Sequence, residues 1–143
     1  MCGRFGDHTQ AHASVLPKDL DGHIVICVSY HPRLEHYIVP LRRLRPHIPV
    51  VLVSPDSTMY YELMFRLTQI KAMQPGLNLD QVYYVHGTGK QRKSLEKARA
   101  DRAEATVLLS AMDSRDDSDC LMSAFALEQV RPSDCMCAFK CSA

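Results

Sequence analysis

Eight residues that could bind a ligand follow directly after short apolar runs of the sequence. They are Ser29, Tyr30, Ser54, Asp56, His86, Gly87, Thr88 and Ser110. If the apolar runs are parallel strands of one sheet, these residues lie at its carboxyl edge, where open α/β sheets bind ligands. We therefore predict a ligand crevice lined by these eight residues. In the alternative interpretation, Ser29, Ser54 and Ser110 only cap strand ends or the helices that follow them.

The sequence lacks the glycines that hold a pyrophosphate after the first strand. A dinucleotide fingerprint needs glycine at the first, third and sixth positions of residues 28–33, but Val28, Tyr30 and Arg33 stand there. Their side chains would keep a phosphate away from the backbone, so we expect no nucleotide cofactor. Asp56, which could otherwise bind a ribose hydroxyl, is then expected to cap a helix.

Residues 87–90, with the sequence Gly-Thr-Gly-Lys, are similar to the end of a phosphate-binding P-loop. That motif requires an earlier glycine where Tyr84 stands and a serine or threonine where Gln91 stands. It also belongs after the first strand, whereas these residues follow the third. We interpret the segment as a flexible turn between a strand and a helix.

Two segments have residues that could bind a metal, but neither has suitable spacing. If the acidic segment 113–119 began an EF-hand loop, the loop would need a glycine at its sixth position and a glutamate at its twelfth, but Ser118 and Ala124 stand there. Its acids are instead expected to complement the dipole of a following helix. On an extended strand Cys135 and Cys141 would lie roughly 20 Å apart, at about 3.3 Å per residue, too far apart to share one zinc ion. We expect no metal site, and thiols that are free.

The sequence has no pattern typical of catalysis. No serine lies in a Gly-x-Ser-x-Gly elbow, no cysteine has a basic activator nearby, and the seven histidines form no close pair on one helical face. We therefore expect no enzymatic activity.

The apolar pattern alternates between strands and helices. Continuous apolar runs predict strands at Ile24–Val28, 50–53, 81–85, Ala105–Leu109 and 135–141. Apolar residues spaced three and four apart predict helices over 34–44, 60–70 and 121–127, with a short basic helix near 95–98. Pro40 should kink the first helix. The fold class is therefore α/β, a Rossmann-like doubly wound parallel sheet of five strands.

Length and composition are typical of one globular domain. The chain has 143 residues and a formal net charge of +1, which gives no sign of a nucleic-acid partner. No apolar stretch approaches the roughly 18 residues of a membrane-spanning helix. Six cysteines without an export signal indicate a reducing compartment. We predict a flexible tail over residues 1–22 and a single domain over 23–143.

Several segments of the domain are similar in sequence to one known protein family. The segment 22–27 looks like the opening strand of that family, and Val39-Pro40-Leu41-Arg42 is similar to a segment of its calcium- and sodium-activated members. The longest similarity covers 82–110, with Tyr-Val-His-Gly at 84–87, Leu-Glu-Lys-Ala at 95–98, Ala103 and the run 105–110. Residues 116–127 are similar to the helix that follows. The resemblance spans roughly residues 23–141.

The segments resemble RCK domains, the cytoplasmic gating modules of potassium channels, and the resemblance implies the Rossmann-like (Trk-N type) amino-terminal lobe of such a domain. Its expected function is regulation of a ligand-gated potassium channel, and thus of potassium transport, on the cytoplasmic side of a membrane. Its expected partners are other RCK-like lobes, as a homo-oligomer, and the channel pore. The sequence contains no pore and no second lobe, so we expect a truncated fragment that is soluble when it stands alone.

The residues that bind calcium in relatives have no counterparts here. The loop 42–47 is basic where some relatives have an acid, and Ser110 replaces an aspartate of others. The resemblance therefore implies the module without its calcium sensitivity. Two alternatives remain, a nucleotide-binding Rossmann sensor or small enzyme, and a free-standing interaction domain.

Overall fold

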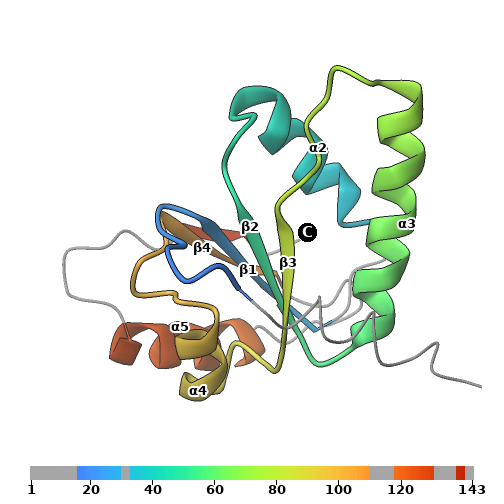
Figure 1. Cartoon of the computed structure of the whole chain (residues 1–143). Helices are drawn as coiled ribbons and strands as arrows, with labels where there is room; N and C mark the ends of the chain where they lie inside the picture. Colours follow the sequence, from blue (N-terminus) through green and yellow to red (C-terminus); the bar gives the residue numbers. More distant parts are fainter. Residues whose placement is uncertain (1–15, 30–32, 110–117, 131–137, 141–143) are drawn as a thin grey trace, which may run out of the picture.

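The structure is a computed structural model that describes residues 16–29, 33–109, 118–130 and 138–140 (Figure 1). Its strands are β1 (Ile24–Val28), β2 (Val50–Ser54), β3 (Val82–His86), β4 (Ala105–Leu109) and β5 (Ala138–Lys140). Its helices are α2 (Glu35–Leu44), α3 (Ser57–Met73), α4 (Arg92–Lys97) and α5 (Ser118–Val130). All strand pairs are parallel, in the order β3-β2-β1-β4-β5. The predicted α/β, Rossmann-like sheet is thereby confirmed.

Strand β1 is the centre of the sheet because it is apolar along its whole length. It pairs with β2 on one side and with β4 on the other, and all five of its residues are buried. A strand covered on both faces has no place for polar alternation, which explains the continuous apolar run.

Successive residues of each strand face opposite cores, since side chains alternate along a strand. Ile24, Ile26 and Val28 face the core beneath α2 and α3, while Val25 and Cys27 face the core beneath α4 and α5. Figure 1 shows α2 and α3 on one side of the sheet and α4 and α5 on the other. Layers on both faces make the sheet doubly wound.

The helices begin and end where local chemistry dictates. Asp56 caps α3, because its side chain accepts a hydrogen bond of 2.9 Å from the backbone N–H of Thr58. Helix α2 has no side-chain cap and continues through Pro40 as one helix of 10 residues. Because Pro40 is exposed, its ring displaces no core side chain.

Several boundaries differ by a few residues from those that the sequence predicts, and two of the differences have a clear physical reason. Strand β3 begins at Val82, because Gln81 has a φ of 61° and cannot continue an extended strand. Residues 16–22, placed in the tail by the sequence, pack on the lobe. Leu20 is 5% exposed in the core beneath α4, and the N–H of Gly22 donates to the carbonyl of Arg102 at 3.1 Å. The packed unit therefore begins before residue 23.

Among the described residues, none of the helices has the length and apolar character needed to cross a membrane.

Candidate functional site at the carboxyl edge of the sheet

The strand order places a switch point beside β1. The chain passes from β1 to β2 and β3 on one side, then crosses back to β4 on the other side of β1. Connections that leave in opposite directions separate at this point, and open α/β sheets bind ligands there. The register pairs Val28 with Leu109, so β1 and β4 end at the same level.

Ser54 joins the ends of three strands at this edge. Its backbone carbonyl accepts the N–H of Gly87 at 3.1 Å and the hydroxyl of Tyr84 at 2.8 Å. Its side-chain oxygen accepts the N–H of Asp56 at 3.1 Å and lies 3.5 Å from the carbonyl of Ser29. Ser54 is buried, and its hydrogen bonds lie within the protein. This geometry is what the alternative interpretation, a strand-end cap, describes.

Tyr84 extends the network toward His86. Its hydroxyl lies 3.2 Å from Nδ1 of His86, and its ring stacks on Tyr60 with centroids 5.1 Å apart. Burial is the main cause that raises the pKa of Tyr84 to about 12. The phenol therefore stays protonated at neutral pH and acts as a hydrogen-bond donor. The imidazole of His86 itself is exposed at the edge.

The turn after β3 approaches its neighbours too closely for any residue but glycine. Gly87 has a φ of 154°, and a Cβ there would lie 2.1 Å from Oγ of Ser94. A Cβ on Gly89 would lie 2.9 Å from Cβ of Cys27 and 3.0 Å from Oγ of Ser123. The turn is thus packed directly against the end of β1 and against α5.

Gly89 leaves little space at the switch point. The cavity there has a volume of about 20 Å³, and its lining residues are Cys27, Val28, Ser29, Pro55, Thr88, Gly89, Lys90, Leu108, Leu109 and Ser123. Sites for small molecules are typically about 300–1,000 Å³. Burial raises the pKa of the Cys27 thiol to about 12, so the thiol is protonated at neutral pH.

Six of the eight predicted site residues lie where the sequence places them, at the ends of three adjacent strands. Ser29 follows β1, Ser54 ends β2, and His86 ends β3 with Gly87 and Thr88 behind it. Asp56 lies at the same edge, but its carboxylate is directed to the N-terminus of α3. Tyr30 and Ser110 lie outside the described residues.

In the part of the chain that the structure describes, no three His, Cys, Asp or Glu side chains are grouped to hold a metal ion. Cys135, Cys137 and Cys141, and most of the acidic segment 113–119, lie outside the described residues.

Sequence reasoning missed a buried arginine whose hydrogen bonds hold the segment that leads into β3. Arg42, on α2, is 1% exposed and donates to the carbonyls of Gln81 at 3.1 Å and Asn78 at 3.4 Å. Among the described residues, its Nε has no hydrogen-bond partner, and burial lowers its pKa. The signal that could have found it is its position four residues after Ile38, on the buried stripe of the helix.

A buried histidine at the start of β1 was also missed. His23 is fully buried, and its Nε2 lies 2.8 Å from the carbonyl of Ala98, just after α4. Its Nδ1 has no hydrogen-bond partner within the part of the chain that the structure describes. Burial is the largest influence on its pKa, which is lowered below the ordinary value. The ring is therefore neutral at neutral pH and joins β1 to the end of α4.

Comparison with known families identifies one match over most of the chain. Residues 19–137 match the family described as the calcium-activated potassium channel slowpoke-like RCK domain. No curated protein sequence matches the chain significantly.

Solved structures share the fold at low sequence identity. The GsuK channel bound to NAD superposes with a TM-score of 0.56 at 17% identity, over 90% of this chain and 20% of that one. GsuK bound to ADP superposes with a TM-score of 0.58 at 16% identity, over 94% of this chain and 30% of that one. The TrkA-N domain of the inner membrane protein ybaL from Escherichia coli superposes with a TM-score of 0.59 at 16% identity, over 87% of this chain and 76% of that one. The chain thus spans about a fifth of the NAD-bound GsuK chain.

Proposed function

The chain belongs to the slowpoke-like RCK domain family of calcium-activated potassium channels, and on that premise we propose that it is a Rossmann-type regulatory lobe that acts on a channel gate. The match of residues 19–137 to this family carries the proposal. Its place of action is the cytoplasmic side of a membrane, and its partners are other RCK-like lobes and the subunits of a potassium channel.

We further propose that the lobe acts through protein contacts, with no nucleotide at the switch point. GsuK has been solved with NAD and with ADP, so a nucleotide sensor is the alternative. Here Val28 stands at the first glycine position of the fingerprint, and Gly89 leaves a cavity of about 20 Å³. The residues of the predicted crevice, Ser54 above all, would then serve to hold the strand ends rigid.

Helix α5 offers a surface for such contacts. Three of its apolar side chains are more than half exposed, namely Leu121 at 59%, Met122 at 55% and Phe125 at 61%. Apolar side chains grouped on one exposed helix are typical of a protein interface. A lobe that docks through α5 would bury this area against its neighbour.

A contact between proteins can regulate a gate only if its affinity differs between the open and the closed arrangement of the gate. If the lobe binds the open arrangement of the gating modules more tightly than the closed one, it shifts the population toward the open channel. Couplings of this kind are typically about 1–3 kcal/mol, or roughly 5- to 150-fold in the gating equilibrium.

The proposal can be tested by adding the purified full chain to the cytoplasmic face of excised patches that contain a slowpoke-type channel. We expect a reversible change in open probability at fixed voltage and calcium. The double substitution Leu121→Ser with Phe125→Ser should abolish the change. Phe65→Ser, which removes an exposed aromatic residue from α3, is the matched control and should preserve it.

Two outcomes would contradict the proposal. A folded chain that leaves the current unchanged would exclude direct gating of the tested channel class. Calorimetric binding of NAD or ADP with a dissociation constant in the low micromolar range would favour the nucleotide sensor instead.

A further inference from the structure

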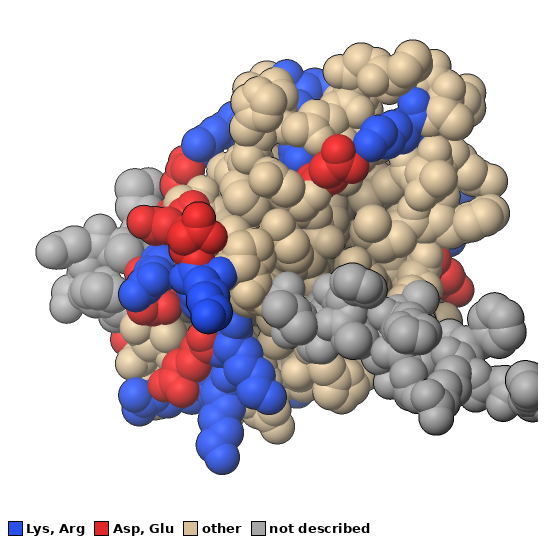
Figure 2. Space-filling model, in the orientation of Figure 1, with Lys and Arg blue, Asp and Glu red and all other residues tan. Residues whose placement is uncertain are grey.

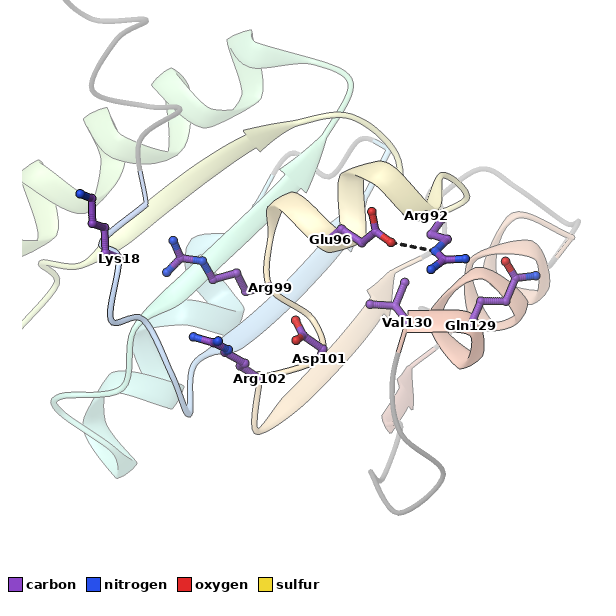
Figure 3. Close-up of a pocket in the computed structure, with 8 residues that line it drawn as sticks. All are labelled: Lys18, Arg92, Glu96, Arg99, Asp101, Arg102, Gln129 and Val130. Carbon is purple, nitrogen blue, oxygen red and sulfur yellow. Dashed lines mark hydrogen bonds and ion pairs between the residues drawn. The ribbon is translucent and has the colours of Figure 1, made fainter.

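A second and larger hollow lies at the opposite edge of the sheet, where the strands begin. Its volume is about 500 Å³, and its lining residues are Lys18, Arg92, Glu96, Arg99, Asp101, Arg102, Gln129 and Val130 (Figure 3). They come from the segment before β1, from α4 and the loop after it, and from the end of α5. We call it the basic hollow. It shares no lining residue with the cavity at the switch point.

The charges of the basic hollow do not cancel. Of its two acids, Glu96 forms an ion pair with Arg92, with Oε1 2.7 Å from Nε. That leaves Lys18, Arg99 and Arg102 with only Asp101 to oppose them. Within the described residues, neither Lys18 nor Arg102 takes part in a side-chain ion pair. Figure 2 shows Lys and Arg gathered on this side of the molecule, with acidic residues among them.

The backbone after α4 holds two of the arginines in place. The N–H of Ala100 donates to the carbonyl of Leu95, and that of Arg99 donates to the carbonyl of Glu96, each at 3.0 Å. This closure puts Arg99 at a φ of 53°, a position that glycine or asparagine usually occupies. Figure 3 shows the guanidinium groups of Arg99 and Arg102 pointing to the same side.

Arg99 has capacity left for a ligand. Its Nη1 donates to the carbonyl of Pro17, which ties the segment before β1 to the hollow. A guanidinium has five N–H donors in a planar fork that matches two phosphate oxygens. The bond to Pro17 uses one of them, so the group can be anchored and still bind an anion.

We propose that the basic hollow binds a compact polyphosphate anion, with Arg99 and Arg102 on its oxygens and Lys18 as a nearby point charge. A volume of about 500 Å³ accommodates such a ligand. Val130 is the apolar member of the lining and no aromatic residue is present, so the hollow suits phosphate groups better than a nucleobase. A phosphorylated sugar, an inorganic polyphosphate and a lipid headgroup share this chemistry. The inference does not depend on the proposed gating function.

The test is calorimetry of the full chain with sodium tripolyphosphate at low ionic strength. Lys18→Gln with Arg102→Gln should weaken binding at least about tenfold, because charge-assisted hydrogen bonds to phosphate are lost. Asp101→Asn should strengthen binding about threefold, since it removes the opposing charge. The control is Lys93→Gln, which removes one positive charge from α4 outside the hollow and should change affinity less than about twofold.

A parallel arm uses vesicles of phosphatidylcholine with and without a phosphatidylinositol bisphosphate. If soluble tripolyphosphate binds and the variants change its affinity in the expected order, the ligand is a free anion. Binding of the phosphoinositide vesicles alone, with the same ranking, assigns the hollow to a lipid headgroup. The proposal is overturned if neither probe binds, or if Lys93→Gln weakens binding as much as the double substitution. Circular dichroism spectra matching that of the wild-type chain show that each variant is folded.

Discussion

Gly89 packs against the end of β1 at the switch point, and its replacement by alanine tests the packing there. A Cβ at this position would lie 2.9 Å from Cβ of Cys27, 3.2 Å from its Sγ and 3.0 Å from Oγ of Ser123. The hydroxyl of Ser123 can rotate away. The Cβ of Cys27 cannot, because β1 is fixed by hydrogen bonds to β2 and β4 on both sides.

The cost can be worked out from two opposing effects. Adding a methyl group to a filled core typically costs about 1–3 kcal/mol. Alanine also reduces the conformational freedom of the unfolded chain, which restores about 0.4–1 kcal/mol. Because the Cβ of Cys27 cannot move away, the packing cost should lie in the upper half of its range, about 2–3 kcal/mol. We therefore expect Gly89→Ala to lower the free energy of unfolding by about 1–2.5 kcal/mol. For a domain of this size that lowers the melting temperature by roughly 3 °C per kcal/mol.

The assay is urea denaturation followed by circular dichroism, with Gly76→Ala as the matched control. Gly76 has nothing within 4 Å of its added Cβ, so only the effect on the unfolded chain remains, and this variant should gain about 0.4–1 kcal/mol. If Gly89→Ala is as stable as the wild type, the turn does not press on β1. The explanation of the small cavity would then be wrong.

Three further results are expected. Arg42→Ala should lower the free energy of unfolding by about 2–4 kcal/mol, because it removes a buried side chain from the packing beneath α2 together with its hydrogen bonds to the carbonyls of Gln81 and Asn78. Arg43→Ala, which removes an exposed hydrogen bond to Gln74, should cost less than about 0.5 kcal/mol. Equal losses in urea denaturation would refute the role of Arg42. The pKa of His23 is lowered in the folded state, so the contribution of the neutral ring to the free energy of unfolding is complete above the ordinary pKa and is lost as pH falls through the lower folded value. Stability measured from pH 7.5 to 5 should therefore decrease less steeply in His23→Gln than in the wild type. His36→Gln is the exposed control, and an unchanged slope in His23→Gln would contradict this account. Millimolar calcium should leave the melting temperature unchanged, whereas a site at a hundredfold excess over its dissociation constant would add about 2.7 kcal/mol.

The sequence by itself determined the type and the order of the elements. Continuous β-branched runs and apolar stripes are local patterns, and each specifies a strand or a helix without knowledge of its neighbours. Parallel strands joined by helices then permit few arrangements, because the crossovers are right-handed. The same reasoning located the carboxyl edge and placed Ser29, Ser54, Asp56, His86 and Thr88 along it.

Only the tertiary structure decided what those residues touch. The contacts of Ser54 with Gly87 and Ser29, and the approach of Gly89 to Cys27, join residues of different strands and turns. No periodicity in the sequence encodes such distances. Arg42 and the basic hollow show the same limit, since their partners lie on other elements. Burial and charge depend on which distant segments meet, and this is settled when the layers pack together.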